Sequence, residues 1–284
     1  MINFCLNSIK FLIKKTLKKI QRSSTNNKKA IYLAPIIYGN NNIFFECHND
    51  SYIEKKVLLY QDHCNYILDS ISNFIRDDSY FIDIGANIGT VSLSIAKKYS
   101  KNGLKVLAFE ASERLSLKFK RNMKINNLTN VRLLNQALSK NNSIMEFYEP
   151  DLSSFNQGLG NLSKNLDLKK YNKKKIQTRS LDSLLKDEKL IDIKISVIKI
   201  DVQGHEMEVI AGAMETIRRC KPVIVMEYEE QYDDINKSNK LNLLKFLKDF
   251  GYEVFLVDIY EKDIYKKINP ASFKKGNILC IKIS

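Results

Sequence analysis

The sequence predicts a doubly wound α/β fold around a mostly parallel, seven-stranded sheet with an antiparallel edge strand. From residue 80 onward, short runs rich in β-branched residues alternate with longer amphipathic stretches, the pattern of strands joined by helices. Near the C-terminus, the apolar runs YEVFLVDI and NILCIKI follow each other with no helix between them, so we expect them to form an antiparallel edge hairpin. Ligands of such folds bind beyond the carboxyl ends of the strands.

The alternation can be followed element by element. It opens with the strand YFIDIG at 80–85 and the helix TVSLSIAKKYS at 90–100. A less regular stretch separates residue 138 from residue 195. The further expected strands are 105–110, 131–138, 195–201, 222–228, 252–259 and 277–283, and the further expected helices are 113–127, 206–220 and 241–251.

Three regions are expected along the chain. Residues 1–29 form a basic amphipathic helix and a linker, and residues 30–78 form a small N-terminal β/α extension. Within this extension, short apolar runs at 30–58 favour β-structure, and the apolar spacing over about 61–76 favours a helix. Residues 79–284 form the α/β domain.

The first 22 residues have an amphipathic helix pattern, and lysines interrupt any run long enough for a signal peptide or a spanning helix. One interpretation is a helix in the interface of an anionic membrane leaflet. The other is a helix packed on its own domain or on a partner. The apolar residues recur at steps of three and four: Ile2, Leu6, Ile9, Ile13, Leu17 and Ile20.

The charge distribution and the cysteines restrict the function classes. The net charge is +14, but eight basic residues and no acidic residue precede Glu46, which leaves +6 for the rest of the chain. We therefore expect no nucleic-acid partner. Five widely spaced cysteines without a CxxC motif favour a reducing compartment, so the expected location is the cytoplasm, with the inner membrane face as the contact site of the tail. Three histidines and scattered acids predict no metal site.

The stretch FIDIGANIGT at 81–90 is the first sign of a ligand site. Gly85 and Gly89 bracket the point where a strand becomes a helix, so the backbone there can turn sharply and approach a ligand closely. The spacing is GxxxG, which differs from the GxGxxG of a dinucleotide fold. Taken alone, the stretch is equally explained as a structural turn.

Three further strands end in polar or small residues. Glu110 ends the second strand, where a carboxylate can accept hydrogen bonds from both ribose hydroxyls of an adenosine ligand or can cap the next helix. Gln136 and Ala137 follow the third strand, and Asp201 ends the fourth. Because the carboxyl ends of parallel strands meet at one edge, these positions predict a single cleft.

Six stretches follow one another along the chain: FIDIGANIG, VLAFEAS, NQALS, RSLDSLL, IKIDVQGHEMEVIAGA and PVIVMEY. Together, over roughly residues 80–228, they resemble the FkbM-type S-adenosylmethionine-dependent methyltransferases. The resemblance implies a class I methyltransferase fold with S-adenosyl-L-methionine as cofactor. It also implies methyl transfer, typically to a hydroxyl oxygen of a sugar, glycan or secondary metabolite.

The resemblance also implies roles for individual residues. Glu110 would hold the ribose, and Asp201 would lie near the cofactor amino group or the acceptor. Ala111 stands where the family often has proline, so we expect a different loop over the adenine, and Gln203 replaces the acidic residue of a DVEG motif. The loop under the methionine part would consist of Asp83, Gly85, Ala86, Asn87 and Gly89, and the border of the adenine would be Gln136 and Ala137.

Transfer to a hydroxyl requires a base, because the pKa of a sugar hydroxyl is far above 7. We rank Asp201 first and His205 second, followed by Glu206 and Glu227. Both glutamates are also explained as helix-capping or ion-paired residues, and His205 as a residue that begins a helix and bonds backbone or solvent.

Acceptor specificity is expected in the long stretch 150–178, because loops of this length in a compact domain are often functional. Its lysine cluster either favours an anionic acceptor or is a solvated run of charge. The expected partner is thus a small-molecule or glycan acceptor; the oligomeric state stays open.

Two alternatives compete with this interpretation. The first is a nucleic-acid (RNA) methyltransferase on the same fold, but DVQG stands where amino-methylating members carry a proline-rich motif that cups a flipped base. The second is a non-catalytic scaffold protein that retains the fold, which the intact glycine loop disfavours.

Overall fold

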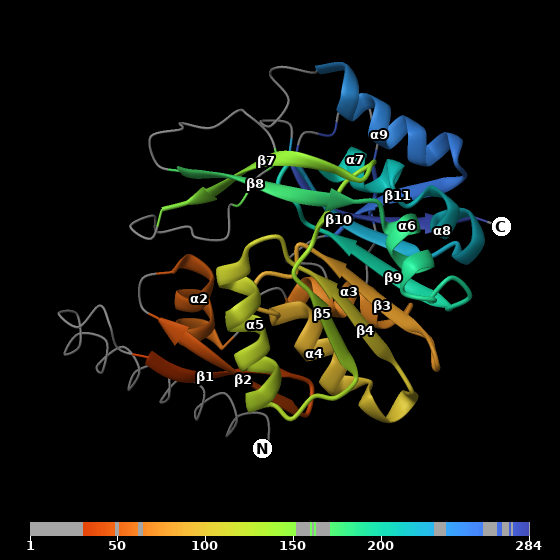
Figure 1. The fold of residues 1–284 in the computed structure, drawn as a ribbon. Coiled ribbons are helices and arrows are strands. Elements are labelled where there is room, and N and C mark those ends of the chain that lie inside the picture. Colours follow the sequence, from red (N-terminus) through yellow and green to blue (C-terminus); the bar gives the residue numbers. More distant parts are fainter. Residues whose placement is uncertain are drawn as a thin grey trace.

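The fold was analysed in a computed structural model, which describes residues 31–48, 51–61, 65–151, 160, 162, 171–229, 237–257, 266–268, 273 and 275–283. Its centre is a mostly parallel sheet in the order β12-β11-β13-β10-β9-β3-β4-β5 (Figure 1). The predicted doubly wound α/β fold is therefore confirmed, but the sheet has eight strands in the described part of the chain and not the seven expected. The strands are β3 (Tyr80–Ile84), β4 (Lys105–Phe109), β5 (Val131–Leu134), β9 (Ile195–Ile200), β10 (Val223–Glu229), β11 (Tyr252–Leu256), β12 (Lys266–Lys267) and β13 (Lys275–Lys282).

Helices cover both faces of this sheet (Figure 1). Side chains alternate along each strand, so Phe81 packs on one helical layer while Ile82 and Ile84 pack on the other. Burial of both faces explains why the strands are almost continuously apolar. One layer comprises α3 (Asn65–Ser72), α4 (Thr90–Lys98) and α5 (Glu113–Ile125), and the other α6 (Leu181–Asp187), α7 (Glu206–Ala211), α8 (Met214–Cys220) and α9 (Lys237–Asp249).

The C-terminal strands pair as expected but lie elsewhere in the sheet. β11 and β13 are antiparallel, yet β13 is inserted between β11 and β10 and is antiparallel to both, while the two-residue β12 forms the edge. Ile278, Leu279 and Cys280 are completely buried. A strand that is apolar on both faces is stable inside a sheet and not at its edge.

Two expected elements are interrupted. The helix expected at 206–220 is split into α7 and α8 at Gly212, where a Cβ would lie 2.1 Å from the carbonyl oxygen of Ser139. The strand expected at 131–138 ends at Leu134, and Ala137–Leu138 forms β6 in a separate three-stranded sheet. Its other strands are β7 (Ser143–Pro150) and β8 (Tyr171–Arg179), which pair with each other antiparallel.

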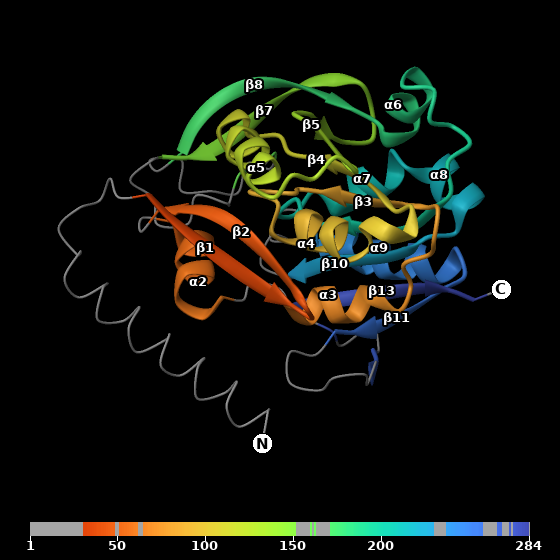
Figure 2. The same ribbon diagram turned by 90° about the horizontal axis from the view of Figure 1, so that it is seen from below.

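The N-terminal extension contains more helix than expected. A hairpin of β1 (Ile31–Tyr38) and β2 (Asn41–His48) is followed by α2 (Tyr52–Tyr60), where the sequence favoured β-structure, and then by α3 (Figure 2). The prediction of strand for residues 52–58 was wrong. Burial of Val57, Leu58 and Glu54 on a single face of α2 accounts for the helix.

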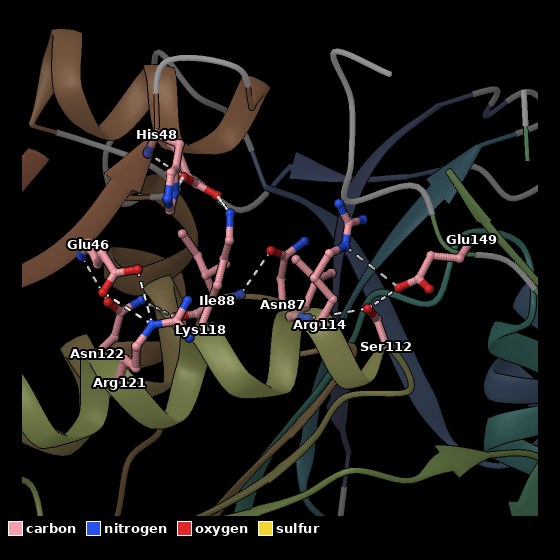
Figure 3. Close-up of polar contacts among 12 residues, drawn as sticks. Glu46, His48, Asn87, Ile88, Ser112, Arg114, Lys118, Arg121, Asn122 and Glu149 are labelled. Atoms are coloured by element: carbon pink, nitrogen blue, oxygen red, sulfur yellow. Dashed lines mark hydrogen bonds and ion pairs between the residues drawn. The ribbon is translucent and has the colours of Figure 1, made fainter. Parts of the chain in front are cut away.

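Side chains of α5 bind the extension to the α/β domain (Figure 3). Asn122 accepts a hydrogen bond from the amide of Glu46 (2.8 Å) and donates one to the carbonyl of Ile88 (3.0 Å), in the loop before α4. Asn126 bonds both the amide and the carbonyl of Phe44. These side-chain amides form hydrogen bonds with the backbone N–H and C=O groups at the outer edge of β2, as a neighbouring strand would.

Two predicted segments lie wholly or mostly outside the described residues. Residues 1–29, which carry the amphipathic pattern, lie outside the residues that the structure describes. Of the acceptor stretch 150–178, the structure describes Pro150, Asp151, the isolated Gly160 and Leu162, and residues 171–178. The last of these form most of β8, so the expectation of a loop was wrong there. No helix in the described part of the chain is long and apolar enough to cross a membrane.

Candidate functional site

A cleft of about 540 Å³ opens at the carboxyl ends of β3, β4, β9 and β10. Its volume lies in the range of about 300–1,000 Å³ that is usual for small-molecule sites. Eight residues predicted for the site line it: Gly85, Asn87, Glu110, Ala111, Gln136, Ala137, Asp201 and Glu227.

The glycines of the opening loop are required by close contacts within the protein. Gly85 has φ +79°, and a Cβ there would lie 1.9 Å from the carbonyl oxygen of Asp201. Gly89 has φ +91° at the start of α4, where a Cβ would lie 2.9 Å from the ring of Phe119. Gly85 lines the cleft, whereas Gly89 and the buried Ala86 lie behind it.

Asp83 lies beneath the cleft and does not line it. Its carboxylate accepts hydrogen bonds from Ser92 Oγ (2.6 Å) and Lys199 Nζ (3.1 Å). Lys199 itself lines the cleft, and its ammonium also lies 3.6 Å from Asp201 Oδ2. We did not predict Lys199 as a site residue; the signal was the one charged residue in the largely apolar strand ISVIKI.

Glu110 connects the ends of β3 and β4. Its two carboxylate oxygens accept hydrogen bonds from the amides of Asn87 (2.7 Å) and Ser112 (2.8 Å). Burial raises the pKa of Glu110 to about 7, although both of these hydrogen bonds oppose the rise. Because each oxygen can accept more than one hydrogen bond, the group can still bind ribose hydroxyls.

The loop after β5 forms the end of the cleft expected to hold adenine. Gln136 donates to the carbonyl of Gln177 on β8 (2.7 Å), and Asn135 donates to the carbonyls of Glu110 (2.7 Å) and Ala111 (3.1 Å). These bonds fix the loop over the end of β4. Apolar surface here comes from Leu138, Phe147 and Leu162.

An amide joins two carboxylates on the opposite side of the cleft. Gln203 Nε2 donates to Asp201 Oδ1 (2.8 Å) and lies 3.2 Å from Glu227 Oε2, also within hydrogen-bonding distance. The Asp201 side chain is 37% exposed, so it is accessible from the cleft. A carboxylate at position 203 would repel both neighbours, whereas the amide holds them together.

His205 and Glu206 lie outside the cleft lining. His205 Nε2 lies 2.9 Å from Ser139 Oγ, and burial lowers the pKa of His205 to about 4. Glu206 accepts hydrogen bonds from the amides of Val202 (3.3 Å) and Gly204 (3.1 Å), and burial raises its pKa to about 7. Both residues thus support the loop that carries Gln203. Of the four residues predicted as bases, only Asp201 and Glu227 line the cleft.

Cofactor geometry agrees with an adenosine ligand. The backbone at Gly85 has no room for a Cβ, the carboxylate of Glu110 could accept hydrogen bonds from a ribose, and apolar surface follows at Leu138 and Phe147. Within the described ranges, no group of three histidine, cysteine, aspartate or glutamate residues could hold a metal ion.

Comparisons with known proteins match the same region. The model of the methyltransferase FkbM domain family matches residues 83–254. Methyltransferase 1 of Beauveria bassiana (strain ARSEF 2860) is 27% identical over 48% of this chain and 59% of its own length. The 2-O-methyltransferase NoeI of Sinorhizobium fredii (strain NBRC 101917 / NGR234) is 30% identical over 57% of this chain and 68% of its own length.

Among solved structures, the methyltransferase FkbM from Methylobacillus flagellatus KT aligns with 80% of this chain and 52% of its own, at a TM-score of 0.45 and 16% identity. The chain thus spans about half to two thirds of the lengths of these relatives. The family match covers more than half of the chain and contains the strand ends that form the cleft. The chain therefore belongs to the methyltransferase FkbM domain family.

Proposed function

We propose that this methyltransferase methylates a hydroxyl oxygen of a sugar, a glycan or a secondary metabolite. The observation that carries the proposal is the bridge of Gln203 between Asp201 and Glu227, which holds two proton acceptors on one side of the cofactor cleft. The name of one relative, 2-O-methyltransferase NoeI, supports oxygen as the acceptor atom.

The cofactor supplies a methyl group made electrophilic by a sulfonium. Asn87 and Glu110 would bind its ribose side, and Ala111, Gln136 and Ala137 would border the adenine. Asp83 acts from below the cleft, where its carboxylate balances the charge of Lys199. This balance reduces the repulsion that an isolated ammonium would exert on a cationic ligand.

Asp201 and Glu227 are the residues that would remove the acceptor proton. A hydroxyl oxygen becomes a good nucleophile as its proton passes to a carboxylate, and such proton transfer contributes about 10²–10⁴-fold to a rate. Gln203 holds both carboxylates in place, so a hydroxyl between them and the cofactor would be both deprotonated and aligned.

The first experiment measures S-adenosylhomocysteine binding by calorimetry and then transfer of labelled methyl to a panel of glycans, lipid-linked sugars and RNA. We expect S-adenosylhomocysteine to bind and a hydroxyl-bearing acceptor to be labelled. No binding at millimolar ligand would exclude the cofactor site, and labelling of RNA alone would replace the proposal with a nucleic-acid methyltransferase.

Variants then test the base. Asp201→Asn and Glu227→Gln should both still bind S-adenosylhomocysteine. If one of these two carboxylates is the base, its variant should lower kcat by about 10²-fold or more. Glu208→Gln is the matched control, because Glu208 is a carboxylate on α7 that does not line the cleft. If both cleft variants retain full activity, neither carboxylate is the base.

The membrane contact proposed for residues 1–22 requires a separate experiment, since it concerns a segment outside the described residues. Flotation with anionic liposomes compares the full chain with a chain that lacks residues 1–22. Loss of flotation on deletion supports the contact, and equal flotation of the two chains eliminates it.

A further inference from the structure

The N-terminal extension supplies part of the cleft wall. Three residues of α2 and two of α3 line the cleft, and all of them precede residue 83, where the family match begins. The first residues of β13 complete this side. These wall residues are Tyr52, Ile53, Lys56, Tyr66, Ile67, Lys275 and Asn277.

At α3 and β13, this wall adjoins Glu227. In the pairing of β10 with β13, Asn277 stands directly opposite Glu227. Asn277 Nδ2 also donates to Tyr66 Oη at 3.0 Å, which joins α3 to the sheet beside Glu227. An acceptor hydroxyl bound beside Tyr66 and Asn277 would therefore lie close to Glu227.

The wall is held in place by buried charges. Glu54 of α2 is almost completely buried, forms an ion pair with Lys118 of α5 and accepts a hydrogen bond from the amide of His48. A second ion pair, Arg121–Glu46, joins α5 to β2. Breaking a buried pair is costly, so α2 presents a preformed surface to the cleft.

The charges on the wall differ from those beneath the cofactor. Lys199 is balanced by Asp83 and Asp201. Lys56 takes part in no ion pair within the described part of the chain, and its ammonium lies 4.6 Å from the centre of the Tyr52 ring. Lys275, the first residue of β13, is a second lysine in the cleft lining.

The polar groups between these lysines suit hydroxyls. The side-chain amides of Gln203 and Asn277 both line the cleft, and apolar surface comes from Ile53 and Ile67. A few convergent polar groups on an apolar wall are typical of small-molecule sites. We propose that α2, α3 and the start of β13 form the acceptor subsite, and that it selects a sugar unit bearing a carboxylate or phosphate group, which Lys56 binds.

This inference rests on the proposed O-methyltransferase function and is tested with the full chain saturated with S-adenosylhomocysteine. Calorimetry measures the binding of three probes: glucuronic acid, glucose 1-phosphate and glucose. We expect at least one anionic probe to bind about tenfold more tightly than glucose, and the stronger of the two identifies carboxylate or phosphate as the group recognised.

Variants locate the selectivity. Lys56→Met should weaken binding of the preferred anionic probe by about threefold or more and leave the affinity for glucose and for S-adenosylhomocysteine unchanged. The matched control is Lys55→Met, since Lys55 neighbours Lys56 on α2 but does not line the cleft.

Three results would overturn the inference while leaving the cofactor site intact: equal affinity for glucose and both anions, absence of binding of every probe at millimolar concentration, or equal effects of the two lysine variants. Failure of S-adenosylhomocysteine itself to bind would instead overturn the proposed function.

Discussion

Lys199 Nζ lies 3.1 Å from Asp83 Oδ1, and the two residues are neighbours in the parallel register of β9 and β3. The side chains are 10% and 1% exposed. The same ammonium lies 3.5 Å from the carbonyl oxygen of Gly85 and 3.6 Å from Asp201 Oδ2. One buried lysine thus joins the floor of the cleft to the loop and to a proposed base.

Replacing this lysine should destabilise the protein. Lys199→Met leaves the Asp83 carboxylate buried without its cation, so the free energy of unfolding should fall by about 3–5 kcal/mol. Urea unfolding measures the change. The double variant Lys199→Met/Asp83→Asn removes both charges and should recover part of the loss, whereas strictly additive effects would show that the two residues are not coupled.

Gly85→Ala should be far more damaging than the same replacement at a glycine with no close neighbours. Its Cβ would collide with the carbonyl oxygen of Asp201, so we expect a loss of stability of about 3 kcal/mol or more together with weaker S-adenosylhomocysteine binding. Gly39→Ala is the control, because Gly39 also has positive φ (+60°) but no atom lies within 4 Å of its Cβ position. That variant should lose about 1–2 kcal/mol, the cost of the left-handed conformation. Similar losses in the two variants would contradict the role of the close contact.

Cofactor affinity should rise with pH through the titration of Glu110. Burial raises the pKa of this carboxyl to about 7, and its ionised form is the stronger acceptor for ribose hydroxyls. The protonated form dominates below that pH, so affinity should increase by up to about tenfold between pH 6 and pH 8. Calorimetric titration with S-adenosylhomocysteine across this range measures the effect.

Glu110→Gln should abolish this dependence. Glu206→Gln is the matched control, because burial also raises the pKa of Glu206 to about 7, yet this side chain lies outside the cleft. If the pH dependence of affinity disappears in the Glu206 variant and persists in the Glu110 variant, the titrating group is Glu206 and the prediction for Glu110 is wrong.

His205 should affect stability in acid and not the pH dependence of transfer. Burial lowers its pKa to about 4, below the value of about 6.5 expected in the unfolded chain. Its contribution to stability is therefore fully present above pH 6.5 and is lost as pH falls through 4. Between pH 7 and pH 4, the wild type should lose on the order of 3 kcal/mol more than His205→Gln. Urea unfolding at a series of pH values tests this; parallel losses would show that His205 titrates normally.

Local sequence patterns predicted most of the fold. Apolar runs alternating with amphipathic stretches defined the central sheet, because strands buried on both faces and helices buried on one leave different periodicities. The same patterns did not reveal that β13 lies between β10 and β11, or that the helix at 206–220 is broken at Gly212. Strand order and close backbone contact depend on partners far away in the chain.

Part of the site followed from the sequence for a simple reason. Gly85, Glu110 and Asp201 each end a parallel strand, and such ends meet at one edge of a sheet wherever the helices lie. The resemblance of their motifs to the FkbM family then identified the cofactor. By itself, the sequence determined the α/β fold, the edge that holds the cleft and the family.

The tertiary structure decided which side chains face the cleft. His205 and Glu206 are close to Asp201 in sequence but turn away as α7 begins, whereas Glu227 and Gln203 meet across two strands. Lys199 was marked in the sequence only as a lone lysine in a largely apolar strand. Its role and that of Tyr66 on α3 arise from contacts between segments more than 100 residues apart. Strand ends are fixed by local periodicity, but the direction of each side chain and its partners are fixed only by packing.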